Sequence, residues 1–267
     1  MDRAEAVGLE TVLCRAPEKL EPCDPSRCTE MLHRLLKKLS QDQFEELTRD
    51  GEVVTSDRVG PKLLRTADGR CVKLFRRRHL LTSGLLFPPA LRFCYAARRL
   101  ARLEIPSVSV EAAYRVPALA RHIVVYGELA GTTLRQTILD PSRSEAALQD
   151  LARFLSRLHR SGVYFRAIHF GNVLVRPEGG LALIDISECR FRPWRLRPGL
   201  RARNWKPLFS KAEDAAALQA FGLERFLASY LQSSGLEGKV RRRFLTLLAR
   251  IRPEMRAPVE ALGEGSD

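Results

Sequence analysis

The sequence predicts an α+β fold, with a small antiparallel sheet and one helix in its N-terminal part and a larger, mainly helical C-terminal part. From Gly51 onward, apolar residues gather in short strand-like runs, and Asp68-Gly69 is a strong signal for a hairpin turn between two of them. From Ser144 to Arg160, leucines recur at helical spacing and predict a long amphipathic helix. We therefore expect residues 1–49 to form an arm and a helix, residues 50–127 a first lobe, and residues 128–267 a second lobe.

Charge is the unusual part of the composition. The chain has 267 residues, of which 45 are Lys or Arg and 31 are Asp or Glu, a formal net charge of +14. This excess favours an anionic partner: nucleic acid, a phosphorylated glycan or an acidic membrane face. No apolar run approaches the roughly 18–20 residues of a membrane-spanning helix, and the first residues lack a signal-like segment. We expect a cytoplasmic protein, with a peripheral contact at the inner membrane as an extension of that expectation.

The six cysteines are scattered along the chain, which suits reduced thiols better than a disulfide framework. Cys23 and Cys28 lack the paired spacing of a zinc site, and no second Cys/His pair follows them. The sequence therefore predicts no metal site built from thiolates.

The first lobe is expected to begin after a helix over Thr29–Arg49, where Leu and Met recur at intervals of three and four. Three strand-like runs follow between residues 51 and 77, and Lys73 lies on the third of them, CVKLF. A helix is expected over Pro88–Leu103, ended near Ile105-Pro106. Two further strands, VSVEAAYRV and RHIVVYGEL, complete the predicted sheet.

The second lobe is expected to begin with a Thr-capped helix in GELAGTTLRQTIL. The Ser144–Arg160 helix delivers the chain to a loop, which leads into the strand NVLV, a Pro-Glu-Gly-Gly turn and the strand LALID. After a basic segment whose prolines argue against a long helix, two closing helices are expected at about Lys211–Tyr230 and Gly238–Ile251.

The loop and the strands after it carry the predicted chemistry. Asn172 lies on the loop, and Asp185 lies at the end of the second strand. A loop amide followed by a strand-terminal carboxylate is how a phosphotransferase holds a divalent metal on nucleotide phosphates. Mg²⁺ prefers hard oxygen ligands, commonly one or two carboxylates together with phosphate oxygens and water. Asn172 and Asp185 are therefore the predicted metal ligands.

This order of segments resembles the protein-kinase-like fold, and specifically the bacterial lipopolysaccharide core kinase (Kdo/WaaP-type) branch. Protein kinases carry H-R-D-x-x-x-x-N in the catalytic loop, and related small-molecule kinases carry H-G-D-x-H-x-x-N. With the final Asn at Asn172, His169 matches the second His, and Asp185 matches the metal-binding Asp after the loop. The resemblance implies a two-lobed fold, ATP and Mg²⁺ as cofactors, Lys73 on the α/β-phosphates, and backbone around Glu128 against adenine.

Three features depart from the family pattern. The position of the catalytic Asp is Ala167, and the position of the first His is Phe165. The Gly-rich phosphate loop is not recognisable, and the Pro88–Leu103 helix has no Asp or Glu to pair with Lys73. We expect Lys73 to contact Asp185 or phosphate instead. His169 has two interpretations: a substitute base, or a residue whose hydrogen bond orders the loop around Asn172.

The basic segment after Asp185 also has alternatives. Its arginines alternate with Trp194 and Trp205, a pattern that could grip nucleic acid by phosphate pairing and stacking. Arginine forks equally suit the phosphates of a glycolipid core, and a plain solvated face is the third interpretation. Placement beside the predicted site favours an anionic saccharide, with these expected substrate contacts: Arg190, Arg192, Arg195 and Arg203.

Three functions therefore remain open. The first is an ATP-dependent phosphotransferase acting on a sugar hydroxyl of the lipopolysaccharide inner core, with His169, Asn172 and Asp185 as its catalytic residues. The second is a pseudokinase that binds nucleotide as a regulator or scaffold, favoured by Ala167 and the missing Gly-rich loop. The third, a nucleic-acid-binding module, lacks any recognised reader motif.

Overall fold

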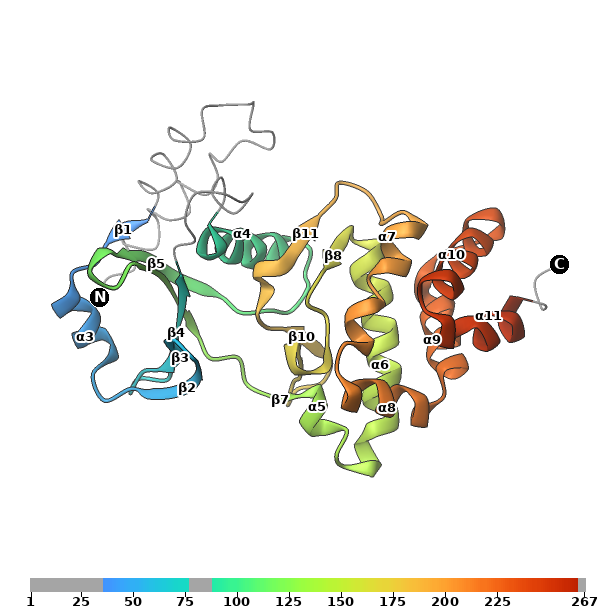
Figure 1. Ribbon diagram of the computed structural model, residues 1–267, viewed down its shortest axis with the longest axis horizontal. Coiled ribbons are helices and arrows are strands. Elements are labelled where there is room, and N and C mark those ends of the chain that lie inside the picture. Colours follow the sequence, from blue (N-terminus) through green and yellow to red (C-terminus); the bar gives the residue numbers. More distant parts are fainter. Residues whose placement is uncertain (1–35, 77–87, 264–267) are drawn as a thin grey trace. The chain divides into compact units, whose positions relative to one another are not determined.

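The computed structural model describes residues 36–76 and 88–263; residues 1–35, 77–87 and 264–267 lie outside it. The described residues divide into two compact units, an N-terminal and a C-terminal one (Figure 1). The N-terminal unit consists of the described residues up to Arg98 together with Val108–Leu129. The C-terminal unit consists of Arg99–Ser107 and the described residues from Ala130 onward.

The N-terminal unit is built on a six-stranded sheet in the order β1-β5-β6-β4-β3-β2. Its pairs are antiparallel except for β1 with β5, which is parallel. The strands are β1 (Lys37–Lys38), β2 (Glu52–Asp57), β3 (Gly60–Arg65), β4 (Arg70–Arg76), β5 (Val110–Val116) and β6 (Arg121–Gly127). The predicted hairpin at Asp68-Gly69 joins β3 to β4, and Gly69 supplies the positive φ of 81° that this turn needs.

One face of this sheet carries an apolar cluster. Leu64, Val72, Val116, Ile123 and Val125 are buried together there. Leu39 and two residues of helix α3 (Gln41–Thr48), Phe44 and Leu47, pack against the cluster. The short amphipathic helix therefore closes this side of the sheet, as the alternating pattern of the strands requires.

The opposite face holds the helix α4 (Pro89–Arg102). The ring of Phe93, a fully buried residue of this helix, lies 5.8 Å from the ring of Phe75 on β4 and 5.4 Å from that of Tyr126 on β6, centroid to centroid. Strand β4 thus sends Val72 to one face and Phe75 to the other. Lys73, two residues before Phe75, belongs to the α4 side.

The expected helix over Thr29–Arg49 is confirmed only for Gln41–Thr48; its residues before Leu36 lie outside the described part, and Lys37–Lys38 are not helical. Lys37–Lys38 pair with Tyr114 and Arg115 as strand β1, and the helix begins only at Gln41. Ser40 stops the earlier segment and starts this helix, because its hydroxyl accepts the amide of Gln43 while the Gln43 side chain accepts the amide of Ser40. Leu36 and Leu39 have the spacing of a helix, but in the structure Leu36 is buried next to β1 in the chain and Leu39 packs against the apolar cluster of the sheet.

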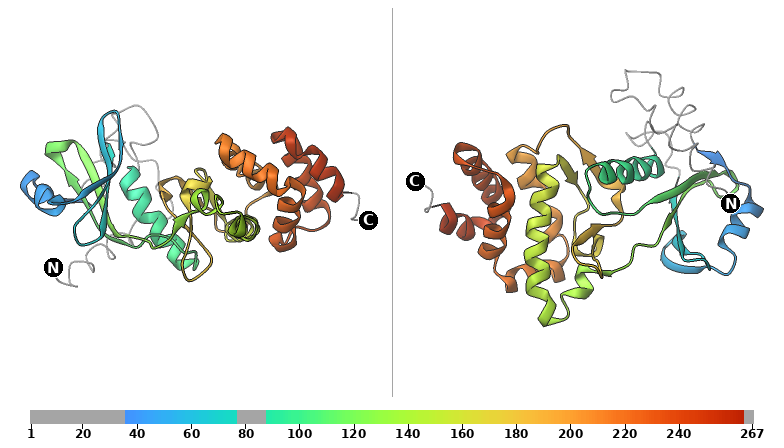
Figure 2. Two further views of the ribbon diagram at one scale, coloured as in Figure 1. Left: turned by 90° about the horizontal axis from the view of Figure 1, so that it is seen from below. Right: turned by 180° about the vertical axis from the view of Figure 1, so that it is seen from behind.

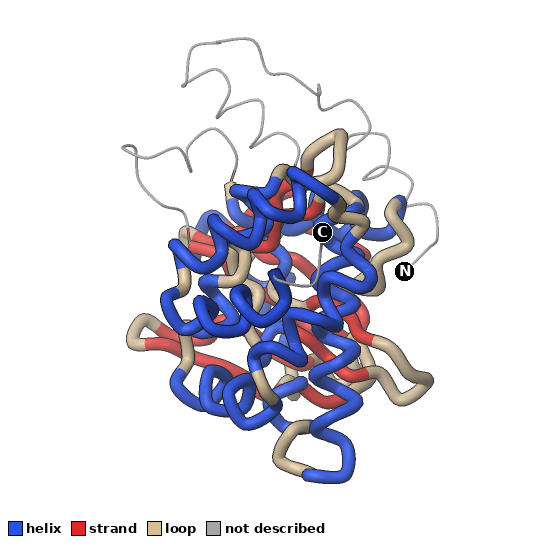
Figure 3. Tube along the Cα trace, turned by 90° about the vertical axis from the view of Figure 1, so that its right-hand side faces the viewer, coloured by secondary structure: helices blue, strands red, loops and turns tan. Residues whose placement is uncertain are grey.

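The C-terminal unit is mainly helical. Its helices of six or more residues are α6 (Pro141–Arg160), α7 (Pro198–Arg203), α8 (Ala212–Phe221), α9 (Leu223–Ser234), α10 (Gly238–Ile251) and α11 (Arg256–Gly263). Helix α6 packs along α9, α7 packs on α10, and α11 packs on α9 and α10. The sequence colours of Figure 2 let these helices be followed, and Figure 3 marks the helices in blue.

Short strands and turns complete this unit. A one-turn helix α5 (Leu134–Thr137) follows β7 (Thr132–Thr133), and Thr133 caps it as predicted. A three-stranded sheet has the order β10-β9-β7, and a pair joins β11 to β8. The remaining strands are β8 (Val163–Phe165), β9 (Val173–Val175), β10 (Leu181–Leu183) and β11 (Cys189–Phe191).

Two boundaries in this unit differ from the sequence-based expectation. Residues 212–234 form two helices because Gly222, at φ 97°, ends α8 and starts α9 in a conformation that side chains disfavour. Helix α6 starts three residues before Ser144, since Pro141 is tolerated in a first helical turn and Asp140 caps it. Helix α11 was not predicted.

The α+β class, with a mostly antiparallel sheet and one long helix in one unit and a mainly helical second unit, is confirmed. Cys71, Cys94 and Cys189 are buried free thiols, as the scattered cysteines predicted; burial raises the pKa of the Cys94 thiol to about 12. Cys14, Cys23 and Cys28 lie outside the described residues. Of the helices described, none has the length and apolar character needed to cross a bilayer.

Candidate functional site

The predicted metal ligands, Asn172 and Asp185, lie at the same end of the β9–β10 hairpin. Val173 and Leu183 are partners in this antiparallel pair. Asn172 and Ile184 therefore form the next step of the ladder, and the Ile184 amide donates to the Asn172 carbonyl at 3.1 Å. Asp185 is the residue immediately beyond. The hairpin thus brings residues thirteen positions apart in the sequence to one end of two short strands.

The side chain of Asn172 is fixed in one orientation. Its Nδ2 donates to the carbonyl oxygen of Ala167 at 2.9 Å, across the loop, and the residue is buried. With the nitrogen engaged in this way, the Oδ1 atom is the group that can act as a ligand.

Asp185 has a left-handed backbone, with φ 51° and ψ 47°. Only a few non-glycine residues adopt this region, and Asp is among the types that tolerate it. The hydroxyl of Ser187 donates to its Oδ1 at 3.4 Å. Residues held in this conformation cluster at functional sites, and here it turns the chain out of β10 directly after the hairpin.

One amide oxygen and one carboxylate fit Mg²⁺ only when other oxygens complete the coordination. Within residues 36–76 and 88–263, no group of three or more His, Cys, Asp or Glu side chains could hold a metal ion by itself. The donor set therefore suits a cation that arrives on the phosphates of a nucleotide, which supply further oxygens.

His169 makes the hydrogen bond that one of its two interpretations requires. Its Nδ1 accepts the amide of Gly171 at 3.1 Å. Burial lowers the pKa of His169, and the charges of Arg135 and Lys211 lower it further against the opposing carboxylates of Asp214 and Asp185. The ring is therefore neutral near pH 7.

In a neutral imidazole with Nδ1 as acceptor, the proton sits on Nε2. A base would need a free lone pair on the nitrogen that faces the acceptor hydroxyl. This geometry favours the ordering role of His169 over the role of a substitute base. Gly171 permits it, because a Cβ there would lie 3.3 Å from Nδ1.

Asp214 holds the loop through hydrogen bonds, a role that was not predicted from the sequence. Its fully buried carboxylate accepts Nε of Arg135 at 2.8 Å, Nη2 of Arg135 at 3.0 Å and the amide of Phe170 at 3.0 Å. A two-pronged pair of this kind is strong and directional, and the hydrogen bonds with Asp214 raise the pKa of Arg135. An acid in the first turn of an otherwise apolar-looking helix was the only available signal.

A second buried network holds the strand that leads into the loop. Asn204 accepts the amide of Phe165 at 3.3 Å and donates to its carbonyl at 2.6 Å. His159 joins the network through Asn204 at 3.2 Å and the hydroxyl of Tyr230 at 2.8 Å. Burial lowers the pKa of His159 to about 3, so this ring is neutral and structural.

These contacts correct the interpretation of the basic segment. Trp205 and Arg201 are fully buried, and Trp205 packs its ring edge against Phe226 and Tyr230. Arg201, Asn204 and Trp205 have i, i+3, i+4 spacing, which places them on one helical face. That spacing could have predicted burial, and it removes Trp205 as a stacking surface for bases. Trp194, in contrast, is 78% exposed.

The predicted substrate arginines have different surroundings. Arg190 is half-buried, and its Nη1 donates to the carbonyl of Cys189 at 3.2 Å. Arg192, Arg195 and Arg203 are exposed. Their contact with a saccharide stays a prediction.

Lys73 and Glu128 belong to the N-terminal unit. The Nζ atom of Lys73 lies 5.7 Å from the ring centroid of Phe93 and 5.9 Å from that of Phe75. An aromatic ring of β4 and one of α4 therefore lie near this lysine. The carboxylate of Glu128 accepts Nε of Arg65 at 3.0 Å and Nη2 at 2.5 Å, directly after β6 ends at Gly127. The meeting of Lys73 with Asn172 and Asp185 stays a prediction, as does an adenine contact at Glu128.

In chain order, the elements are β4 with Lys73, helix α4, strands β5 and β6, helices α5 and α6, the loop to Asn172, and the β9–β10 hairpin followed by Asp185. This is the order that the resemblance to the protein-kinase-like fold predicts. No protein-family model matches the sequence, and no curated protein matches it.

Two solved structures are similar to the chain. One is a divergent kinase that lacks the glycine-rich loop and regulates membrane ultrastructure of the Toxoplasma parasitophorous vacuole: 15% identity over 91% of this chain and 93% of that one, with a TM-score of 0.46. The other is a kinase of the Cydia pomonella granulovirus: 12% identity over 57% of this chain and 56% of that one, with a TM-score of 0.36. These likenesses are too weak to transfer a function.

Proposed function

We propose that the chain is an ATP-dependent phosphotransferase that acts on a sugar hydroxyl of the lipopolysaccharide inner core. The observation that carries the proposal is the arrangement at the end of the β9–β10 hairpin. The Asn172 side chain donates to the carbonyl of Ala167, and Asp185 directly follows Ile184, whose amide donates to the carbonyl of Asn172. This pair supplies one neutral and one anionic oxygen ligand, a set suited to Mg²⁺ on nucleotide phosphates.

Each residue then has a stated task. Asn172 and Asp185 hold the cation, and Lys73 pairs with the α/β-phosphates. His169 and Asp214 keep the loop in the shape that Asn172 needs. Bound Mg²⁺ would neutralise charge on the phosphates. The exposed arginines Arg192 and Arg203 offer cationic contacts to a phosphorylated acceptor saccharide.

The missing Asp at Ala167 lowers the expected rate without removing the chemistry. Phosphoryl transfer through a loose transition state depends mainly on positioning and on charge neutralisation, and a general base adds about 10²–10⁴-fold. The proposal therefore describes a slow enzyme. A glycolipid acceptor would bring it to the inner face of the bacterial membrane.

A specific set of observations favours a second candidate, a pseudokinase that binds nucleotide to regulate or scaffold a partner. The side chain of Ala167 offers no acceptor for a proton, Nδ1 of His169 is engaged by Gly171, and helix α4 carries no Asp or Glu. All three affect catalysis or its alignment more than metal binding.

Two measurements on the purified protein separate the candidates. Calorimetric titration with ATP in Mg²⁺ or in EDTA tests the shared part: both candidates require binding that Mg²⁺ strengthens, and binding that ignores Mg²⁺ or is absent would reject both. Incubation with γ-labelled ATP, Mg²⁺ and dephosphorylated core oligosaccharide tests the transfer. Label in the saccharide supports the first candidate, and Mg²⁺-dependent binding with no label leaves the second.

A further inference from the structure

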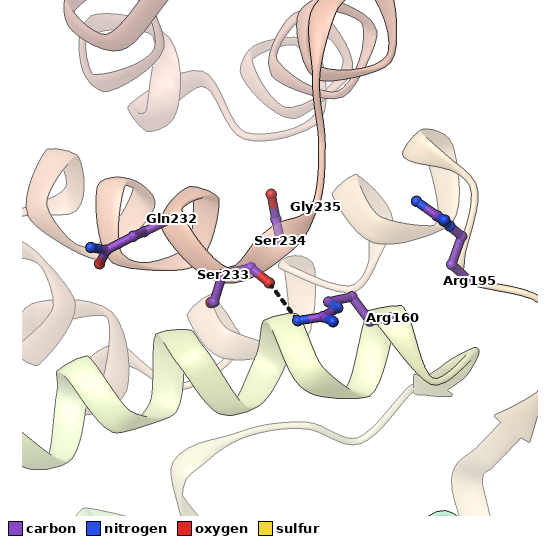
Figure 4. A pocket seen from close by; sticks show the side chains of 6 residues that line it. All are labelled: Arg160, Arg195, Gln232, Ser233, Ser234 and Gly235. Atoms are coloured by element: carbon purple, nitrogen blue, oxygen red, sulfur yellow. Dashed lines mark hydrogen bonds between the residues drawn. The ribbon is translucent and has the colours of Figure 1, made fainter.

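A pocket of about 500 Å³ opens on the C-terminal unit, away from the loop of Asn172. Its lining comes from α6, the loop before α7 and the end of α9: Arg160, Arg195, Gln232, Ser233, Ser234 and Gly235 (Figure 4). Arg160 is the last residue of α6, whereas α5, which contacts the Phe170–Asn172 turn, precedes the start of α6. In Figure 1, α5 lies at the amino end of α6, whereas Arg160 of the pocket is at its carboxyl end. A 20-residue helix spans about 30 Å.

Cations converge on this pocket. Nη1 of Arg160 donates to the carbonyl of Ser233 at 3.3 Å, and Arg195 reaches the pocket from the facing loop (Figure 4). Behind the wall, Nη1 of the fully buried Arg201 donates to the carbonyl of Ser234 at 3.0 Å. Three guanidinium groups therefore stand at the carboxyl end of one helix.

The partial negative charge at the carboxyl end of α9 does not balance the positive charge of these three guanidinium groups. The carboxyl end of a helix carries about half a negative charge, against three positive ones here. Arg201 forms no ion pair within the described part of the chain: its partners are the carbonyls of Leu196 and Ser234 and the hydroxyl of Tyr230, and its Nη2 has no partner there. Tyr230 does not supply an anion, because burial raises its pKa to about 12.

Burying an unpaired guanidinium costs several kcal/mol in general, so an anion placed at the pocket would relieve an existing penalty. The nearest carboxylate along the sequence is that of Glu237, which precedes α10 and is not part of the lining. The amide of Gln232 and the hydroxyl of Ser233 add neutral hydrogen-bonding groups to the wall.

The loop that carries Arg195 is held at both of its ends. The amide of Arg192 donates to the carbonyl of Gly162 at 2.9 Å, and that of Leu196 donates to the carbonyl of His159 at 2.8 Å. Gly162, at φ 74°, lets this loop come close, since a Cβ there would lie 2.6 Å from the carbonyl oxygen of Trp194. The fixed loop presents the Trp194 indole to solvent next to Arg195. Exposed indoles stack on flat apolar faces, including those of sugar rings.

We infer that this pocket is a binding site for a phosphorylated saccharide, with Arg160 and Arg195 on its phosphate and Gln232 and Ser233 on its hydroxyls, and that Trp194, which precedes Arg195 in the chain, reports on binding. A volume of about 500 Å³ is within the range of small-molecule sites. The inference goes beyond the proposed phosphotransfer, since it concerns a different place in the fold and needs neither ATP nor metal.

Binding can be followed through tryptophan emission. The chain has two tryptophans, and Trp205 is buried while Trp194 is exposed, so the red-shifted part of the spectrum reports on Trp194. The full-length protein is titrated, without nucleotide, with a hexose 6-phosphate, the unphosphorylated hexose and inorganic phosphate. Saturable quenching by the hexose 6-phosphate and weaker binding of the other two are expected.

Matched variants test the assignment. Arg160→Gln and Arg195→Gln should each weaken hexose 6-phosphate binding about tenfold, the effect of losing one charge-assisted hydrogen bond. Arg250→Gln removes the same charge from an exposed position at the far end of α10 and should change binding less than twofold. Both pocket arginines are exposed, so the variants should fold, which circular dichroism verifies.

Four results would overturn the inference. Absence of saturable binding would reject the site, and an equal loss in Arg250→Gln would show general attraction to a +14 protein. Equal affinity for inorganic phosphate would reject the saccharide as the ligand class. If Arg160 and Arg195 only neutralise the end of α9, their variants will lower the melting temperature and leave the titration unchanged, which also rejects the site.

Discussion

Nδ2 of Asn172 donates to the carbonyl oxygen of Ala167 at 2.9 Å, and this one hydrogen bond closes the loop on which the proposed function depends. It joins two residues that are five positions apart, Ala167 at the position of the missing base and Asn172, the proposed metal ligand. A side-chain hydrogen bond therefore closes the loop at Asn172, although Ala167 at its start has no carboxylate.

The first prediction concerns Asp185. Asp185→Asn keeps the size of the side chain and removes the anionic ligand, so the Kd for ATP in Mg²⁺ should rise at least about 10–100-fold, the effect of even an outer-shell loss at metal sites. Binding in EDTA should change little. Calorimetry in both buffers measures the difference, and an equal change in both would remove Asp185 from the metal site.

His169 offers a sharper comparison between two substitutions. Asn at this position retains a short side chain with an oxygen that can accept the Gly171 amide, whereas Ala does not. If His169 orders the loop, His169→Asn should keep Mg²⁺-dependent nucleotide binding and transfer near their original values, and His169→Ala should weaken both. Loss of transfer in both variants, with nucleotide binding intact, would instead identify His169 as the base.

Ala167 is the position where activity should be gained. Ala167→Asp returns a carboxylate to the start of the closed loop, where a general base is worth about 10²–10⁴-fold. Label transfer from γ-labelled ATP should rise by up to that factor while the affinity for ATP stays within a few-fold. No gain in rate, with folding intact, would mean that the rest of the site is not aligned for transfer and would favour the pseudokinase.

Asp214 should matter for the order of the loop. Asp214→Asn removes the charge that pairs with Arg135 and should destabilise the protein by about 2–3 kcal/mol, below the range for fully buried pairs because Arg135 is partly exposed. Hydrogen exchange at Phe170 should accelerate more than exchange at Phe165, which Asn204 holds. A uniform acceleration would show a loss of global stability alone.

The buried His159 predicts a pH dependence of stability. Its pKa is about 3 in the folded protein and about 6.5 when unfolded, so the unfolded chain binds more protons between these values. Stability is therefore complete above pH 6.5 and falls as the pH drops below it, by at most about 1.4 kcal/mol per pH unit from this group.

Denaturant unfolding between pH 7 and 4.5 measures that slope, in a range above most carboxylate pKa values. His159→Gln can keep hydrogen bonds to Asn204 and Tyr230 but does not titrate, so its slope should be shallower. Identical slopes in the two proteins would show that His159 is not the group responsible.

Much of the fold was accessible from the sequence because its signals were local. The Asp68-Gly69 turn, the Thr133 cap and the leucine spacing of α6 each act within a few residues, and each predicted element is present. The boundary errors also have local causes. Ser40 and Gly222 interrupt patterns that looked continuous, and their effect depends on capping and on φ rather than on hydropathy.

The site was only partly accessible. Asn172 and Asp185 could be paired from a family motif, but the clamps around them join residues far apart: Asp214 is 44 positions from Phe170, and Asn204 is 39 from Phe165. No periodicity records such contacts. Arg201 and Trp205 are a different case, because the sequence interpretation of the basic segment used its composition and not the helical spacing that Arg201 and Trp205 share.

The two borders of the N-terminal sheet have a consequence for how this protein behaves at high concentration. At one border β1 is only two residues long and both are lysines, and at the other the register of β2 against β3 shifts twice between Val53 and Ser56. Charge and irregular pairing are what keep open strands of separate molecules from joining. Despite the exposed Val53 and Val54, aggregation through this sheet should be suppressed.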